Sequence, residues 1–305
     1  MARPKTYFAR ARAPALIWIS SAILFFLALR SAMDNASDPF PSPHSEPSIT
    51  AFSDQRSRLY DKMARDLEEH GPAFLKGGET SQSLSLSDLF ELRNGVVTPI
   101  LKAANPPVRA NVLYLSPEFA KPISEVVKEI FLPYFDGVIW FQNTSIYHFS
   151  MFHASHHLTP VMATDSEIEA EVNAVKQVAE AICPLTIVLD QVVLTSTGVL
   201  LGCWQVISGT DPAEIRAKLR NALPRAPEKQ LYDPVLLHTS FARLLGRPKL
   251  SSEVARVNDK IRGFEAAVSE LWFVEEYDVL ALALNGRMKT RRFHLGCSGD
   301  RNQST

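Results

Sequence analysis

Two stretches of the sequence repeat one order of elements, and this repeat constrains the fold more than any other feature. The first runs from the strand-like segment NVLYLS through a helical pattern to HFSM at His148. The second runs from GCWQVIS through another helical pattern to HTSF at His238. Strand-like runs that alternate with helices in two similar halves are typical of α+β domains. The repeat therefore predicts a pseudo-twofold α+β fold with mostly antiparallel strands.

Apolar periodicity places further helices and strands around this repeat. Two of the strand-like runs flank the turn residues Ser196 to Gly198, as in a hairpin. Ser166 and Glu169 have the spacing of a capping box at the start of one helix. The expected helices are 53–69, 117–135, 166–182, 211–223 and 251–271, and the expected strands lie in 111–116, 137–152, 185–195, 198–208, 234–245, 272–285 and 288–297.

The charge balance argues against one class of function. The chain has 32 basic and 33 acidic residues, and its formal net charge is −1. A chain without a global positive field does not hold long nucleic acid through its phosphates. With 46% hydrophobic residues the chain can still bury a sizeable core, so any phosphate chemistry must depend on a local site.

The N-terminus has the pattern of a membrane segment. Residues 13–29 are apolar and uncharged, and most of the nearby basic residues precede them. The positive-inside rule then predicts a single-pass signal anchor of the ER or Golgi, with a cytosolic N-terminus and a lumenal main domain. A cleaved signal peptide, with secretion, and an organelle transit peptide are the alternatives. The expected organisation is a cytosolic tail over 1–12, a transmembrane helix over 13–29, a flexible stalk over 30–53, a helical extension over 54–110, the main domain over 111–297 and a disordered tail over 298–305.

Two further patterns bear on the compartment. N-glycosylation sequons, usable only on the lumenal side, occur at Asn35, Asn143 and Asn302. The three cysteines lack the spacing of a zinc knuckle or a redox pair. One disulfide with one free thiol and three buried thiols are equally compatible with Cys183, Cys203 and Cys297.

The repeated His-x-Ser motif places reactive groups on one side of each strand. Because side chains alternate along a strand, His148 and Ser150 share a face, as do His238 and Ser240. If the two strands lie side by side at the centre of one sheet, two imidazoles and two hydroxyls meet at one pocket. One imidazole can take a proton from water and the other can give one to a leaving oxygen, while the hydroxyls bond the non-bridging oxygens of a phosphodiester. An ordinary pKa of about 6.5 lets one ring be neutral and the other protonated near neutral pH, and this chemistry requires no metal.

The tetrads HFSM and HTSF, with the order of elements over 111–297, resemble the two-histidine (2H) phosphoesterase superfamily. Its LigT-like members include RNA 2′,3′-cyclic phosphodiesterases and plant cyclic nucleotide phosphodiesterases. The resemblance implies a bilobal α+β domain whose motifs face each other across a cleft, without cofactor or metal. It implies that His148 and His238 are the catalytic pair and that Ser150 and Ser240 contact the phosphate. The chain departs from the family in carrying Ser where Thr is commoner, and in its N-terminal extension.

Two neighbouring groups admit a functional and a structural interpretation. His153, His156 and His157 suggest zinc, but no Cys or carboxylate at ligand spacing completes a site, which favours a polar pocket rim. A position of His156 or His157 near the phosphate is a weaker hypothesis. Strand aromatics can stack a base, although such residues more often fill a core. The aromatics in question are Trp140, Phe141, Tyr147, Phe149, Trp204 and Phe241.

The sequence therefore predicts a metal-independent phosphodiesterase. Its expected substrate is a small 2′,3′-cyclic phosphate, on a nucleotide or at a short RNA end, which is opened to a monoester. The alternative is a catalytically inactive, membrane-tethered binding or scaffold protein that keeps the fold. Because both tetrads are intact, the enzyme is favoured.

Overall fold

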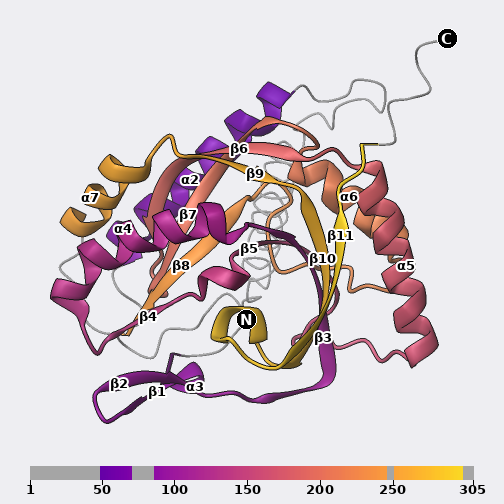
Figure 1. Cartoon of the computed structure of the whole chain (residues 1–305), viewed down its shortest axis with the longest axis horizontal. Helices are drawn as coiled ribbons and strands as arrows, with labels where there is room; N and C mark the ends of the chain where they lie inside the picture. Colours follow the sequence, from indigo (N-terminus) through magenta and orange to yellow (C-terminus); the bar gives the residue numbers. More distant parts are fainter. Residues whose placement is uncertain (1–48, 71–85, 246–250, 298–305) are drawn as a thin grey trace, which may run out of the picture. The chain divides into compact units, whose positions relative to one another are not determined.

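A computed structural model describes residues 49–70, 86–245 and 251–297 of the chain (Figure 1). The expected membrane segment 13–29 lies outside these residues, as do the tail, most of the stalk and the sequons at Asn35 and Asn302. None of the helices within the described ranges combines the length and the apolar character that crossing a bilayer requires.

Two antiparallel sheets form the centre of the described structure, as the α+β prediction requires (Figure 1). Each strand pairs with its neighbours in antiparallel orientation. The first sheet has the order β11 (Met288–His294), β10 (Glu270–Asp278), β3 (Ala103–Tyr114) and β5 (His148–Ser155). The second has the order β4 (Ile139–Phe141), β8 (His238–Leu244), β7 (Val199–Ser208), β6 (Leu185–Leu194) and β9 (Glu265–Val268). A separate hairpin consists of β1 (Phe90–Arg93) and β2 (Val96–Pro99), next to the short helix α3 (Leu86–Leu89).

The sequence repeat corresponds to two similar β-α-β units. In the first, the connection from β3 to β5 contains α4 (Pro117–Phe135) followed by the short strand β4; in the second, α6 (Pro212–Ala222) joins β7 to β8. The condition that the two motif strands lie side by side in one sheet is not met. Strand β5 is the edge of the first sheet, and β8 belongs to the second. Strand β8 already pairs with β7 on one side and β4 on the other, so it has no free edge for β5.

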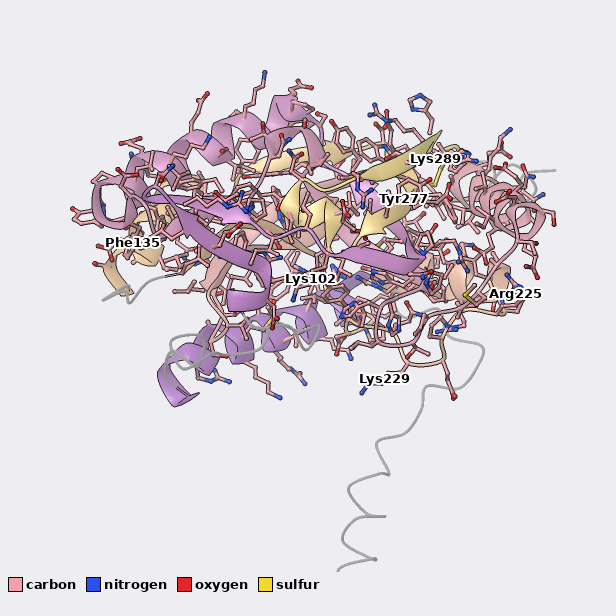
Figure 2. The ribbon with its side chains drawn as sticks, turned by 90° about the horizontal axis from the view of Figure 1, so that it is seen from below. Lys102, Phe135, Arg225, Lys229, Tyr277 and Lys289 are labelled. Carbon is pink, nitrogen blue, oxygen red and sulfur yellow. A yellow bond between two sulfur atoms is a disulfide. The ribbon has the colours of Figure 1, made fainter. Side chains whose placement is uncertain are left out.

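Helices cover each sheet on the face that points away from the cavity between the two sheets, which is described below. Helices α4 and α7 (Ser251–Ile261) pack on the second sheet, and α5 (Asp165–Ala181) and α6 pack on the first (Figure 1). Figure 2 accordingly shows Phe135, at the end of α4, and Arg225, just after α6, at opposite ends of the described structure. Helix α4 presents Ile123, Val127 and Ile130 at helical spacing, and all three are fully buried.

Helix α2 (Ile49–His70) covers the other face of the second sheet, next to the site described below. The Tyr60 ring packs on Leu201 and Cys203 of β7, and the Tyr60 hydroxyl lies 2.8 Å from the carbonyl oxygen of Leu237, immediately before β8. The Arg56 guanidinium donates a hydrogen bond to the Val235 carbonyl at 2.9 Å. The helix begins four residues before the expected start at Ser53. Through these contacts α2 covers this face of the second sheet.

Local sequence rules misplace three element boundaries. The capping box of α5 is formed by Thr164 and Glu167, which have the same spacing as the expected pair, Ser166 and Glu169, two residues earlier. The helix expected over 251–271 ends at Ile261, because Gly263 adopts a left-handed φ of 83° and the chain then pairs with β6 as β9. The strand expected over 272–285 ends at Asp278, and the chain turns at Leu280 (φ 60°) into the short helix α8 (Ala281–Leu284).

The cysteines follow the first of the two patterns left open by the sequence. Cys183 and Cys297 form a disulfide, and Cys203 is a buried free thiol. The disulfide joins the end of the first sheet, after β11, to the connection between α5 and β6. It therefore ties the two halves of the domain together near the C-terminus.

Candidate active site

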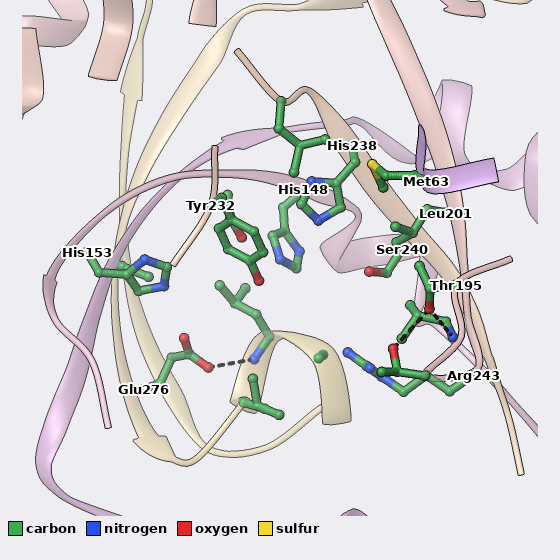
Figure 3. Close-up of a pocket in the computed structure, with 18 residues that line it drawn as sticks. Met63, His148, His153, Thr195, Leu201, Tyr232, His238, Ser240, Arg243 and Glu276 are labelled. Carbon is green, nitrogen blue, oxygen red and sulfur yellow. Dashed lines mark hydrogen bonds between the residues drawn. The ribbon is translucent and has the colours of Figure 1, made fainter. Parts of the chain in front are cut away.

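A cavity of about 210 Å³ lies between the two sheets and brings the four predicted residues together (Figure 3). His148 and Ser150 reach it from β5, and His238 and Ser240 reach it from β8. Figure 3 shows the two imidazoles next to each other at one end of this cavity. The polar lining is completed by His153, Thr195, Thr197, Tyr232, Arg243 and Glu276, and the apolar lining by Met63, Ala110, Val199, Leu201, Leu236, Leu280, Leu282 and Ala283.

A β-bulge at the same place in each motif strand adds a third residue to the cavity. In β5, neighbouring residues of β3 pair with Phe152 and Ser150, so Met151 is an extra residue. In β8, neighbouring residues of β7 pair with Ala242 and Ser240, so the extra residue is Phe241. A bulge reverses the alternation of side chains beyond it. The third residue after each serine therefore enters the cavity, and these residues are His153 and Arg243.

His148 is held in one tautomer by the backbone. Its Nδ1 lies 2.8 Å from the carbonyl oxygen of Ile146, which can only accept, so Nδ1 carries the hydrogen and Nε2 has the free lone pair. Burial lowers the pKa of His148, while the Ile146 carbonyl opposes this effect and Arg243 adds to it. The ring is therefore fixed in orientation and its other nitrogen is available to a ligand.

His238 has a different environment. Its Nδ1 is buried and has no hydrogen-bond partner within the described part of the chain. Burial, with the positive charges of Arg216 and Arg243 and the proximity of His148, lowers the pKa of His238 to about 3. Without a bound anion both catalytic candidates are thus displaced toward the neutral form. Burial of both imidazoles therefore disfavours the protonated ring that the sequence predicts near neutral pH, and no acidic side chain of the described residues forms an ion pair with either imidazole to offset this effect.

Arg243 is a buried cation that lines the same cavity as the two imidazoles, and it lies near Thr195 in Figure 3. Its Nε has no hydrogen-bond partner in the described residues, and no acidic side chain there forms an ion pair with it. Burial lowers the pKa of Arg243, although a guanidinium stays charged at neutral pH. A buried, unpaired guanidinium is costly unless an anion from outside completes it. The cavity therefore has the electrostatic character of an anion site.

Arg216 joins the two motif strands from helix α6. Its guanidinium donates hydrogen bonds to the carbonyl oxygens of Ser150 and Met151 in β5, at 2.9 and 3.0 Å. It also donates to the carbonyl oxygens of Pro234 and Leu236, just before β8, at 2.6 and 2.7 Å. One rigid, planar donor group thus sets the separation of the strands that carry the two histidines.

Only one member of the histidine cluster faces the cavity. His153 lines it, and burial and the nearby His156, His157 and His148 rings lower the pKa of His153 to about 3. His156 points elsewhere: its Nδ1 accepts from the Thr159 N–H, and its Nε2 donates to the Lys229 carbonyl at 3.2 Å. Neither His156 nor His157 lines the cavity, so the hypothesis that one of them lies near the phosphate is wrong.

Other predicted residues have mixed placements. In the described ranges, no group of three or more His, Cys, Asp or Glu side chains is arranged to hold a metal ion. The aromatic candidates Tyr147, Phe149, Trp204 and Phe241 are buried in the main core and do not line the cavity. Asn143 caps a short 3₁₀ helix, η2 (Thr144–Ile146), and its side chain donates to Asn285 at 3.0 Å.

Sequence reasoning missed Arg243, Tyr232 and Glu276. Arg243 had a signal, since it stands three residues after Ser240 just as His153 stands three residues after Ser150. Tyr232 lies in the loop that leaves α6 past Arg225 and Lys229, both labelled in Figure 2, and its ring centroid is 5.0 Å from that of His238. No local pattern marks Tyr232 or Glu276, because loop and sheet packing bring them to the cavity.

Comparison with known proteins gives only distant structural likenesses. No family model matches the sequence, and no curated protein matches it. TT0787 of Thermus thermophilus is 12% identical with a TM-score of 0.45, over 63% of this chain and 99% of its own. E. coli LigT in complex with phosphate is 14% identical with a TM-score of 0.40, over 62% and 98%. ATU0111 of Agrobacterium tumefaciens, a conserved protein of unknown function, is 10% identical with a TM-score of 0.46, over 72% and 91%.

Each of these three likenesses has a TM-score below 0.5. The α+β architecture and the geometry of the cavity stand independently of them.

Proposed function

We propose that this chain is a phosphodiesterase that hydrolyses a small 2′,3′-cyclic phosphate, on a nucleotide or at a short RNA end, to a monoester. One observation carries the proposal. Two imidazoles and two hydroxyls, from equivalent positions of two repeated strands, line one cavity with a buried arginine that forms no ion pair with any acidic side chain in the described part of the chain. A cyclic phosphodiester supplies the missing negative charge and needs an acid and a base for its hydrolysis.

The environments of the two histidines support different roles. Among the described residues, His238 has Arg216 and Arg243 nearby and no hydrogen-bond partner on Nδ1, which keeps its ring neutral, the form that can accept a proton once a phosphate anion offsets the two positive charges. His148 has the Ile146 carbonyl behind Nδ1, which stabilises the imidazolium once a phosphate anion binds in front of Nε2. His238 then takes a proton from the attacking water as oxygen bonds to phosphorus. His148 gives its proton to the ribose oxygen whose bond to phosphorus breaks.

The remaining polar groups suit the phosphate itself. The hydroxyls of Ser150 and Ser240 donate to the non-bridging oxygens, and Arg243 balances the charge that develops on them. Two imidazoles, two hydroxyls and a guanidinium provide each proton transfer and each charge contact of this reaction. We therefore expect activity to persist in excess EDTA. The pairing of His-x-Ser motifs across a cleft is also what the resemblance to the two-histidine phosphoesterases implies.

The test is turnover of 2′,3′-cyclic nucleotides by the full-length protein. His148→Ala and His238→Ala should each reduce kcat by a factor of about 100 or more. His294→Ala is the control, because its side chain is 86% exposed on β11. Wild-type inactivity toward every cyclic phosphate, or activity that survives both substitutions, would refute the proposal. Tight nucleotide binding without turnover would instead favour the binding or scaffold protein.

We also propose that the chain is anchored in a membrane of the secretory pathway through residues 13–29, with the described domain in the lumen. The Cys183–Cys297 disulfide supports this placement, because structural disulfides persist in oxidising compartments. A mobility shift on deglycosylation, abolished when Asn35, Asn143 and Asn302 are all changed to Gln, would test it. If carbonate extracts the protein from membranes and the protein carries no glycan, both the membrane anchor and the lumenal placement of the domain are contradicted.

A further inference from the structure

A buried carboxyl group lines the cavity at the end of β10. Glu276 is only 5% exposed, and Figure 3 shows it across the cavity from Arg243, beside α8. Its carboxylate accepts a hydrogen bond from the backbone N–H of Leu282 at 3.0 Å. One oxygen of the group therefore stabilises the turn into α8.

Glu276 differs from the acidic residues on either side of it. Glu275 pairs with Arg291 at 2.9 Å, and Asp278 pairs with Arg287 at 2.6 Å. Glu276 has only backbone N–H groups as partners, and no basic side chain in the described residues forms an ion pair with it. Burial outweighs those N–H groups and raises the pKa of Glu276 to about 7. A buried carboxyl without a counterion is destabilising, which argues for a role beyond folding.

The surroundings of Glu276 suit the organic part of a ligand. Ala110, Leu280, Leu282 and Ala283 line the cavity around it. Apolar walls with one directional polar group are typical of a site that selects a ligand by shape and by a single hydrogen bond. If the phosphate lies among His148, His238 and Arg243, its alcohol portion is directed toward these walls.

We propose that Glu276 selects the alcohol portion of the substrate by accepting a hydrogen bond from an N–H or O–H group on it. This inference rests on the proposed function for the position of the phosphate. A pyrimidine 2′,3′-cyclic nucleotide has such a donor on its base, which is the exocyclic amino group of cytosine or the N3–H of uracil, and another on its ribose, the 5′-hydroxyl. At a pH above its pKa of about 7 the Glu276 carboxylate can only accept, so a ligand with a carbonyl oxygen in place of the donor sets acceptor against acceptor and is rejected.

Glu276→Gln isolates this contact from the structural one. The glutamine carbonyl oxygen can still accept from Leu282, so the turn into α8 keeps its hydrogen bond. The other oxygen becomes an NH₂ donor, which inverts the hydrogen-bonding character of the side chain toward the ligand. Glu275→Gln is the matched control, because it removes a carboxylate from the adjacent position, which alternation places on the opposite face of β10.

The experiment compares kcat/KM of the three full-length proteins on two substrate pairs. The first pair is 2′,3′-cyclic CMP, which has a 4-amino donor and an N3 acceptor, and 2′,3′-cyclic UMP, which has a 4-carbonyl acceptor and an N3–H donor. The second is 2′,3′-cyclic UMP and its 5′-deoxy analogue. At a pH well above 7, we expect the wild type and Glu275→Gln to prefer one member of one pair by about tenfold or more, and Glu276→Gln to abolish or reverse that preference. The preferred member is cyclic CMP if the amino group is the donor, cyclic UMP over cyclic CMP if N3–H is the donor, and cyclic UMP over its 5′-deoxy analogue if the 5′-hydroxyl is the donor. The pair that responds identifies the donor.

The inference would be overturned if Glu276→Gln and the wild type gave the same ratio of kcat/KM for both substrate pairs. If the wild type hydrolyses none of these substrates, the proposed function fails instead. Dissociation constants of 3′-CMP, 3′-UMP and 5′-deoxy-3′-UMP, measured by calorimetry on the same proteins, then test Glu276 separately. A preference that Glu276→Gln reverses supports its role, and equal affinities in all three proteins refute it.

Discussion

His153 and Arg243 occupy equivalent positions on the two motif strands. Each stands three residues beyond the motif serine, and each is turned into the same cavity by a β-bulge. The equivalence is geometric and not electrostatic, because His153 is held in its neutral form and Arg243 is a cation. The cavity therefore has one charged anchor for an anion, on the side of the second sheet.

Arg243→Met should weaken binding of inorganic phosphate by a factor of about 10 to 100, because a charged hydrogen-bond donor is lost. It should leave the unliganded protein equally or more stable, since a buried charge without a counterion is removed. Calorimetric titration with phosphate and thermal unfolding measure the two effects. His153→Gln, at the equivalent position, is the control and should keep the phosphate affinity. Equal losses in both variants would show that Arg243 is not the anchor.

Arg216→Met should reduce kcat more than it changes KM. The variant leaves the carbonyl groups of Ser150 and Leu236 without a donor and loosens the spacing of the two motif strands. The free energy of unfolding should fall by roughly 2–4 kcal/mol. Arg220→Met is a matched control on the same helix. Arg220 also donates to loop carbonyls, including that of Pro227 at 2.7 Å, but it does not join the two motif strands to each other. If both variants lose kcat equally in their folded temperature range, Arg216 has no specific positioning role.

The cavity histidines should make the free energy of unfolding decrease in acid. His153 and His238 have pKa values of about 3 in the folded protein, whereas an unfolded chain protonates histidine at its ordinary, higher value. Between these pH values the unfolded state binds more protons, so the free energy of unfolding decreases as the pH falls through this window. Glu276, with a pKa of about 7, acts in the opposite direction and is common to all variants. Urea titrations from pH 7.5 to 4 should show a shallower decrease for His153→Gln than for the wild type. His294→Gln should follow the wild type; identical slopes for all three would contradict the prediction.

Reduction of the Cys183–Cys297 disulfide should lower the free energy of unfolding by about 2–4 kcal/mol, because it closes a long loop of the unfolded chain. Denaturant unfolding with and without dithiothreitol measures the change. Cys297→Ala should match the reduced wild type and should not respond to reductant. Cys203→Ala, which removes the buried free thiol, should respond as the wild type does. If dithiothreitol still lowers the free energy of unfolding of Cys297→Ala, the effect arises from a group other than this disulfide.

Much of the framework could be predicted because it depends on local patterns. The helix over 117–135 and the hairpin of β6 and β7 follow from apolar periodicity and turn residues, and the helix expected over 211–223 is α6, capped by Asp211. The errors arose where a distant partner decides the outcome. Residues 265–268 continue a helical pattern, yet they form β9 because the edge of β6 is available to them. The position of β5 at the edge of a separate sheet depends on β8 having both of its edges paired.

The sequence by itself determined that each histidine shares a strand face with a serine, since that follows from the two-residue period of a strand. It also determined that the motif occurs twice in the same β-α-β context. Only the tertiary structure decided that these faces line one cavity and that bulges add His153 and Arg243 to it. It alone placed Glu276 there, and it lowered the pKa values of both catalytic candidates. The reason is that burial, charge proximity and strand register depend on contacts between residues far apart in the chain.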